Sequence, residues 1–169
     1  MTVLTTERLV LRQPNADDTE TVTAFYQTDR SQYVGGPGNN FDAFKQWGFI
    51  LGHWTIRGYG LWAVTEKGSD AIIGLVGPFY PDGWPETEIG WLMFDGFEGK
   101  GYAFEAAEAA LVHARDTLGW TDIVHYISHG NDRSVALAER VGASRDASAA
   151  TPLGKDCLVY RQPQVGRAA

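Results

Sequence analysis

The sequence contains one cysteine, Cys157, among 169 residues. A single cysteine excludes an internal disulfide and a thiolate cluster for zinc, and it fits a reducing compartment. No apolar run approaches the roughly 18 residues of a membrane-spanning helix, and residues 1–12 carry charges where a signal peptide would be apolar. We therefore expect a soluble, cytoplasmic protein with no membrane partner.

Positive charge is also scarce. The chain has 14 Lys and Arg residues against 21 Asp and Glu residues, which gives a net charge of −7. Nucleic-acid binding needs a basic face that neutralises phosphates, so we expect no nucleic-acid partner. An acidic surface would instead attract cationic ligands.

The composition is that of an ordinary folded protein, with 44% hydrophobic and 21% charged residues. A chain of this length can bury one sizeable core. No internal repeat, linker or low-complexity segment divides it, so we expect one domain over residues 1–169. The tail at 162–169 is expected to fray.

Apolar periodicity and turn signals predict the order of the elements. A strand at 7–12 should be followed by one helix ending near residue 27 and another over 42–56. Strands at 61–66, 72–79 and 86–94 are separated by short turns, which favour an antiparallel meander. A helix at 103–118, a strand at 123–128, a helix at 132–141 and a hairpin at 143–161 complete an α/β fold with a mixed central sheet flanked by helices.

The loop Glu98-Gly99-Lys100-Gly101-Tyr102-Ala103 lies between an expected strand and an expected helix. Glycines let successive backbone N–H groups turn toward one point, and the helix start adds unpaired donors, so the loop suits a pyrophosphate. A strand-to-helix turn that binds nothing is the alternative. The P-loop pattern is absent, and Gly99-x-Gly101-x-x-Phe104 lacks the third small residue of a dinucleotide fingerprint.

Further segments flank this loop: Glu88-Ile89-Gly90-Trp91-Leu92-Met93, Asn131-Asp132-Arg133-Ser134, the stretch 138–143 and the opening 6–12. Together with the loop, these segments resemble the GNAT superfamily of acetyltransferases, and within it the ribosomal-protein N-terminal (alanine/serine) acetyltransferase branch. The resemblance implies a GNAT-like fold whose sheet is mostly antiparallel and splays between the strands at 86–94 and 122–128. It also implies an acyltransferase that moves the acetyl group of acetyl-CoA to a primary amine by direct attack through a tetrahedral intermediate.

The resemblance assigns the coenzyme site as well. Backbone amides of the loop would cradle the pyrophosphate, with the residues Glu98, Gly99, Lys100, Gly101, Tyr102 and Ala103. Unpaired amides at Leu92, Met93 and Phe94 would hold the pantetheine arm and the thioester oxygen. Asn131 resembles a pantetheine-contacting asparagine, or alternatively caps the following helix. Glu98 departs from the Gln or Arg of the family, and its carboxylate repels a pyrophosphate unless it turns to solvent, which predicts weaker coenzyme affinity.

Two side chains are candidates for proton transfer. Glu88 resembles a carboxylate near the acceptor amine, although it could also share an exposed strand face with Glu86. Ser134 resembles a hydroxyl near the coenzyme sulfur, although it could also cap the helix. Many relatives carry a tyrosine acid where this chain has Ala138. Cys157 is expected to be half-buried in the last hairpin, away from these motifs, and so a poor nucleophile.

Several alternatives stay open at this point. A GNAT-fold module that senses acetyl-CoA without turnover is the second functional hypothesis. The acceptor could be a protein N-terminus, a polyamine, an amino acid or an aminoglycoside, and an exposed aromatic patch would indicate a homodimer. His53, Trp47 and Trp54 either shape the acceptor pocket or pack in the core. No metal site is expected, because four residues along a strand separate His125 from His129 by about 13 Å.

Overall fold

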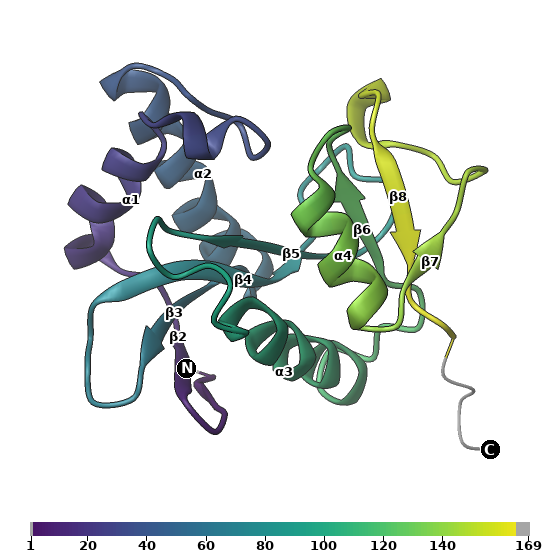
Figure 1. The fold of residues 1–169 in the computed structure, drawn as a ribbon, viewed down its shortest axis with the longest axis horizontal. Helices are drawn as coiled ribbons and strands as arrows, with labels where there is room; N and C mark the ends of the chain where they lie inside the picture. Colours follow the sequence, from purple (N-terminus) through teal and green to yellow (C-terminus); the bar gives the residue numbers. More distant parts are fainter. Residues whose placement is uncertain (1, 165–169) are drawn as a thin grey trace.

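A computed structural model describes residues 2–164 of the protein. One mixed sheet forms its centre, with the strand order β1-β2-β3-β4-β5-β6-β8-β7 (Figure 1). Neighbouring strands are antiparallel except β5 and β6, which are parallel. The strands are β1 (Leu4–Thr5), β2 (Leu9–Arg12), β3 (Trp62–Glu66), β4 (Ile72–Phe79), β5 (Glu88–Met93), β6 (Val124–Ile127), β7 (Ser144–Arg145) and β8 (Leu158–Arg161). The expected mixed, mostly antiparallel α/β fold is confirmed.

Helices cover both faces of this sheet (Figure 1). They are α1 (Thr19–Phe25), α2 (Asn40–Arg57), α3 (Tyr102–Asp116) and α4 (Asp132–Arg140), with short 3₁₀ turns η1 (Ala16–Asp18), η2 (Asp29–Ser31) and η3 (Pro152–Gly154). Helices α3 and α4 lie on one face, and α1 and α2 pack together on the other. The expected helices and strands lie within a few residues of the observed ones, whereas the short strand β1 was not expected.

Helix α3 approaches the sheet closely because the side of the helix that faces the sheet is made of alanine. Its buried residues include Ala106, Ala107, Ala110 and Ala114, each without exposed surface. Small side chains let the helix axis come near the strands. The N-terminal end of α3 directly follows the loop that leaves β5. The expected apolar face of this helix is confirmed.

On the opposite face, α2 contributes a buried aromatic group to the core. Trp47 and Trp54 belong to the buried clusters. His53 is also buried, where its Nδ1 lies 2.9 Å from the Tyr59 carbonyl and its Nε2 accepts from the Tyr80 amide at 3.0 Å. Of the two interpretations of these residues, core packing is therefore confirmed.

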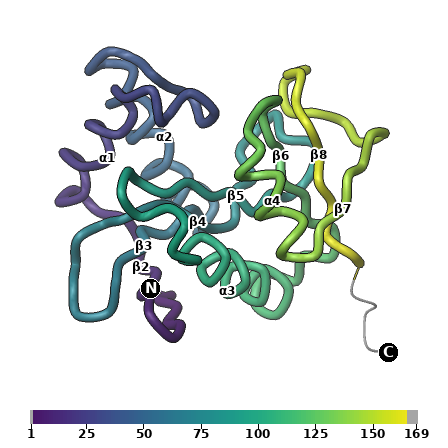
Figure 2. The backbone as a smooth tube through the Cα atoms, in the orientation of Figure 1, coloured from purple at the N-terminus to yellow at the C-terminus, as the bar shows by residue number. Residues whose placement is uncertain are grey.

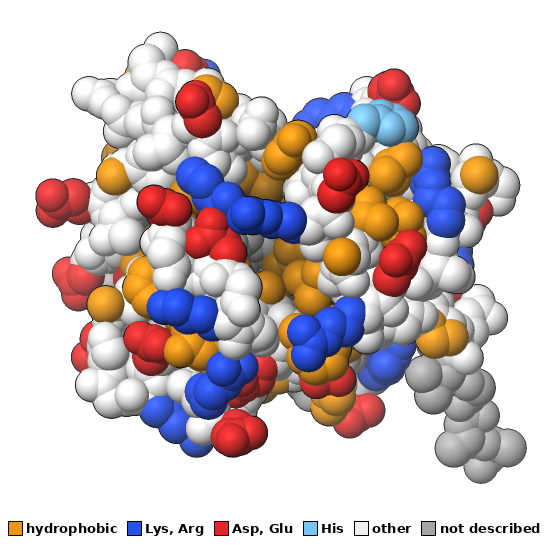
Figure 3. All heavy atoms as spheres, viewed as in Figure 1, with side chains coloured by type: hydrophobic (Ala, Val, Ile, Leu, Met, Phe, Trp, Pro, Cys, Tyr) orange, Lys and Arg blue, Asp and Glu red, His pale blue; other side chains and the backbone are white. Residues whose placement is uncertain are grey.

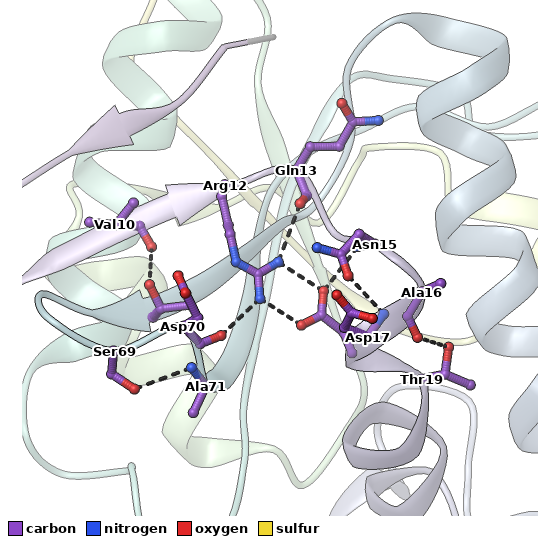
Figure 4. A network of polar contacts seen from close by, with 12 residues as sticks. Val10, Arg12, Gln13, Asn15, Ala16, Asp17, Thr19, Ser69, Asp70 and Ala71 are labelled. Atoms are coloured by element: carbon purple, nitrogen blue, oxygen red, sulfur yellow. Dashed lines mark hydrogen bonds and ion pairs between the residues drawn. The ribbon is translucent and has the colours of Figure 1, made fainter.

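A buried ion pair fixes the start of α1 to strand β2. Arg12 binds the Asp18 carboxylate through both terminal nitrogens, at 2.9 and 2.7 Å, and also donates to the Asp70 carbonyl at 2.9 Å (Figure 4). Asn15 caps η1, as its side chain accepts from the Asp17 amide at 2.8 Å. Losing one partner of such a buried pair typically costs about 3–5 kcal/mol. These contacts tie the start of α1 to β2 and to the turn before β4.

Strands β5 and β6 separate after a single pair. Their register holds only Glu88 opposite Val124, and His125 then takes the place of a ladder partner by donating from Nδ1 to the Ile89 carbonyl at 2.7 Å. Its ring centroid also lies 4.5 Å from that of Trp91, so two side chains fill the widening gap. Figure 2 shows the strands beyond β5 as a separate half of the molecule. The expected splay between these strands is confirmed.

The beginning of the tail differs from the expected fraying over 162–169. Gln162 is only 3% exposed. Its amide N–H donates to the Ile123 carbonyl at 2.9 Å, and its side chain donates to Nε2 of His125 at 3.0 Å. The Gln162 bonds take the place of a strand partner. Gln164 follows and donates to Asp122 at 2.7 Å, so the described chain is held in place up to this residue. Residues 165–169 lie outside the described part.

Candidate active site

A cavity of about 260 Å³ lies between the two halves of the molecule, at the splay. Figure 3 shows this face hollowed along the same line, with hydrophobic side chains inside the hollow and Lys and Arg side chains at its rim. The cavity lining combines β5, β6, α2 and α4. Its polar and reactive members include Glu88, Tyr126, Ser128, Asn131, Ser134 and Cys157. The two expected catalytic residues, Glu88 and Ser134, therefore line one cavity.

Glu88 is half-buried in this lining. Its Oε2 accepts a hydrogen bond from Nε1 of Trp84 at 2.7 Å. Burial raises the pKa of Glu88 from 4.5 to about 7, although the Trp84 bond, the Tyr126 amide and the Lys155 charge oppose the rise. The alternative of an exposed face shared with Glu86 is wrong, because both side chains are half-buried: Glu88 lines the cavity, and Glu86 binds Arg161 at 2.5 and 2.8 Å. A carboxylate with this pKa can accept a proton at neutral pH.

Ser134 lies across the splay from β5. Its Oγ accepts from Nε1 of Trp91 at 3.2 Å, so its own hydroxyl hydrogen stays available. Asn131 is the N-cap of α4, with its side-chain oxygen accepting from the Ser134 amide at 3.3 Å. The capping interpretation is thus confirmed for Asn131 and wrong for Ser134. The asparagine's contact with pantetheine stays a prediction.

The loop Glu98-Gly99-Lys100-Gly101-Tyr102-Ala103, called the phosphate loop below after its expected role, has the backbone that its glycines predicted. Gly99 and Gly101 have φ values of 71° and 81°, which side chains rarely adopt, and Gly101 is the N-cap of α3 without a side-chain cap. Arg8 supports the loop from outside by donating to the Lys100 carbonyl at 2.9 Å and to Glu105 at 2.7 Å. The first-turn amides of α3 therefore have no capping side chain in front of them, which suits an anion.

Not every side chain of this loop faces the cleft. The Tyr102 hydroxyl donates to the Glu66 carboxylate on β3, and Arg8 stacks on the Tyr102 ring at 4.6 Å. The Lys100 ammonium lies 5.0 Å from the Phe97 ring centroid. What Tyr102 can offer to a ligand is consequently its backbone amide.

Glu98 does not turn to solvent. Its carboxylate was expected to repel a pyrophosphate unless it did so. Its Oε1 forms an ion pair with Arg30 of η2, and Nη1 of Arg133 lies 3.6 Å from the same oxygen. The Glu98 side chain is 22% exposed. Two guanidinium groups therefore offset the charge whose repulsion was expected to weaken coenzyme binding.

The end of β5 offers fewer free amides than expected. Phe94 donates its N–H to the Ile73 carbonyl on β4 at 2.9 Å. Backbone groups alternate between the two sides of a strand, so Leu92 also faces β4, whereas Met93 shares the open side with Ile89. Among the three residues proposed for the pantetheine arm, Met93 is therefore the one whose amide faces the splay, and the expected role of the Phe94 amide is wrong.

Three chemically notable residues are among the lining residues that were not predicted as part of the site. Trp84 orients Glu88, as described above. Tyr126 has a buried hydroxyl with no hydrogen-bond partner among the described residues, and burial raises its pKa. Cys157 was expected away from the motifs, yet it lines the cavity; burial and the charges of Glu88 and Asp156 raise its pKa, so the thiol stays protonated. Alternation along the strand next to the splay is the signal that could have placed Tyr126.

Within residues 2–164, no group of three or more His, Cys, Asp and Glu side chains is arranged to hold a metal ion. None of the helices described has the length and apolar character needed to cross a membrane.

Comparison with known proteins identifies the architecture. The family model described as an acetyltransferase (GNAT) domain matches residues 8–144. The chain belongs to the GNAT acetyltransferase family. The expected family and enzyme class, an acyltransferase, are thereby confirmed, and the cavity lies where the sheet of this GNAT protein splays.

Three known proteins illustrate what this chain is similar to. The crystal structure of an acetyltransferase from Agrobacterium tumefaciens str. C58 is 35% identical, with a TM-score of 0.90 over 97% of this chain and 95% of that one. The ribosomal L7/L12 α-N-protein acetyltransferase RimL in complex with coenzyme A is 16% identical, with a TM-score of 0.75 over 95% and 97% of the two chains, and shows the fold alone. The uncharacterized protein YkkB of Bacillus subtilis (strain 168) is 31% identical over 90 residues, which span about half of each protein, 51% of this chain and 52% of that one.

Proposed function

We propose that this protein transfers the acetyl group of acetyl-CoA to a primary amine of a small molecule or peptide. The observation that carries the proposal is the placement of Glu88, with a pKa near 7, in one cavity with Ser134 at the splay. A base that ionises near neutral pH suits an amine acceptor, which must lose a proton to react. Family membership supports acyl transfer in general.

The donor half of the site suits coenzyme A. The coenzyme would supply an activated acetyl thioester, its pyrophosphate held by the amides of Gly99 to Ala103 and its arm by the Met93 amide and Asn131. The left-handed glycines leave the loop free of side chains on this approach. Gly101 has only Arg8 within 4 Å of an added side-chain carbon. A larger residue there would be strained at this positive φ and would shift the backbone whose amides are to hold the phosphate.

The acceptor half opens toward α2 and the segment before it. Its lining includes Tyr33, Phe49, Phe79 and Trp84, which give an apolar passage, with the Glu88 carboxylate as the anionic group beyond them. A cationic amine is attracted to this carboxylate and gives up a proton to it, directly or through water, and the neutral nitrogen then attacks the acetyl carbon. No enzyme nucleophile is needed, which agrees with the protonated state of Cys157.

Two groups would then assist the collapse of the tetrahedral intermediate. The Met93 amide on the open side of β5 can stabilise the negative oxygen, as a fixed backbone dipole does at low cost. The Ser134 hydroxyl, held by Trp91, can pass its hydrogen to the leaving thiolate while it takes the second proton of the attacking nitrogen, so that the amide and the free thiol form and the serine is regenerated. This assigns direct attack with Glu88 as base and Ser134 as acid, and Ala138 explains why no helix tyrosine is available.

The test is a thiol-release assay with acetyl-CoA and a panel of peptides with free N-termini, polyamines, amino acids and aminoglycosides. We expect amine-dependent thiol release that Glu88→Gln lowers by roughly 10²-fold at neutral pH. Calorimetry with coenzyme A runs in parallel. Binding without turnover on any acceptor would contradict catalysis and favour the acetyl-CoA sensor instead.

A further inference from the structure

The segment between α1 and α2 crosses the mouth of the splay. It contains η2, and Figure 2 shows it reaching toward β6 and α4. The Tyr33 hydroxyl donates to the Gly130 carbonyl at 3.1 Å, and Ser128 donates to the Tyr33 carbonyl at 3.3 Å. These bonds join the two halves of the molecule across the cleft. They do not involve the phosphate loop, so the segment is held even if its contact with that loop changes.

The second contact of this segment is with the loop itself. Arg30 pairs with Glu98 and also donates to the Met93 carbonyl at 3.5 Å, while Arg133 of α4 approaches the same Glu98 oxygen at 3.6 Å. One carboxylate therefore holds a guanidinium from each side of the cleft. The three side chains together carry a charge of +1, although the whole protein carries −7.

These ion pairs are poor candidates for holding the fold together. Arg30 and Arg133 are 37% and 78% exposed, and exposed pairs contribute only about 0–1 kcal/mol. The Arg133 contact is too long for a direct hydrogen bond. A weak contact of this kind can be exchanged for a stronger one. Phosphate oxygens bind a guanidinium in the same two-pronged geometry as a carboxylate and carry more charge.

We propose that Glu98 is a built-in counter-ion that holds Arg30 and Arg133 beside the phosphate loop and gives them up to the phosphate groups of coenzyme A. This inference rests on the proposed function. In the free protein, the carboxylate keeps both arginines at the loop and offsets their mutual repulsion. When the coenzyme binds, its phosphates take both guanidinium groups, and the carboxylate turns away from the loop.

The exchange makes Glu98 a competitor of the coenzyme. The carboxylate must be displaced from the arginines, so it lowers coenzyme affinity while it preorganises them. A thiol that has the pantetheine arm but no phosphate groups gains no affinity from the exchange. The arginines therefore select coenzyme A over shorter thiols with the same pantetheine arm, and Glu98 sets how tightly the coenzyme is held.

Calorimetry with coenzyme A and with pantetheine tests this directly. We expect Glu98→Gln to bind coenzyme A about 3–10-fold more tightly, because a competing anion is removed, with pantetheine binding unchanged. Arg133→Gln should weaken coenzyme A binding about tenfold, again without effect on pantetheine. In the double variant the gain from Glu98→Gln should shrink, since one of the competed cations is gone. Glu20→Gln is the control, because it removes the same charge at an exposed position on α1.

The opposite results would overturn the proposal. If Glu98 only positions the arginines, Glu98→Gln weakens coenzyme A binding; if it only shapes the loop, coenzyme A and pantetheine change together. Equal gains from Glu98→Gln and Glu20→Gln would reduce the effect to overall charge. Wild-type binding of coenzyme A with no gain in Glu98→Gln overturns the exchange but leaves the proposed function intact. No binding of coenzyme A by any variant overturns both.

Discussion

Replacing Glu88 with Gln should separate the catalytic role of this carboxylate from its cost to stability. The substitution keeps the shape of the side chain, and the amide oxygen of Gln can still accept the hydrogen bond that Trp84 donates at 2.7 Å. It removes the group whose pKa burial raises to about 7. Two independent measurements should then move in opposite directions, with activity falling and stability at alkaline pH rising.

The expected change in activity follows from the ionised fraction of Glu88. With a pKa near 7, about a tenth of the carboxylates are ionised at pH 6 and about nine-tenths at pH 8. The wild-type kcat/KM should therefore rise about tenfold between these pH values. Glu88→Gln should be roughly 10²-fold slower at neutral pH, and the difference should narrow at high pH, where the amine loses its proton without help.

The sign of the stability change follows from the direction of the pKa shift. The folded protein holds the Glu88 proton up to about pH 7, whereas the unfolded chain loses it near 4.5. The unfolding free energy contributed by this group is therefore full below 4.5 and is lost as pH rises to about 7. The shift corresponds to at most about 3 kcal/mol. Glu88→Gln should match the wild type at pH 5 and melt roughly 5–10 °C higher at pH 8.

Thiol-release kinetics from pH 6 to 9 and melting curves at pH 5 and 8 provide both measurements. Glu86→Gln is the matched control: it removes a nearby carboxylate that binds Arg161, and it should keep the rise in kcat/KM near pH 7. A wild-type profile that is flat between pH 6 and 8, or wild-type rates in Glu88→Gln, would refute the base assignment. Equal melting temperatures for the two proteins at pH 8 would refute the burial argument.

Four other outcomes are expected. Gly101→Val should weaken coenzyme A binding about tenfold in calorimetry, whereas Gly119→Val, with a similar left-handed φ of 69°, should cost stability alone; equal affinities would contradict the loop assignment. Ser134→Ala should lower kcat with little change in coenzyme affinity or melting temperature, while Asn131→Ala should lose about 1 kcal/mol as the true cap. Tyr126→Phe should melt at or above the wild-type temperature, because it removes a buried hydroxyl without a partner, and a clear loss of stability would show an unseen partner. Cationic acceptors should be used better than neutral ones, by a margin that added salt reduces; a margin that salt leaves unchanged would contradict electrostatic steering.

Local patterns in the sequence were sufficient for much of this protein. The alternation in β2, the alanine face of α3 and the left-handed glycines at Gly99 and Gly101 each depend on residues that are neighbours in the chain. Periodicity and turn chemistry report such features directly. The family motifs then predicted the splay after Glu88 and brought Ser134 to the same site. Glu88 and Ser134 both line the observed cavity.

Tertiary structure alone decided the charges and the free hydrogen bonds of the site. The ion pairs of Glu98 join it to Arg30 and Arg133, which are 68 residues before it and 35 residues after it in the sequence. The pKa of Glu88 likewise depends on burial between two separate halves. Desolvation and ion pairing act over a few ångströms in space, and no pattern along the chain records which distant side chains come that close.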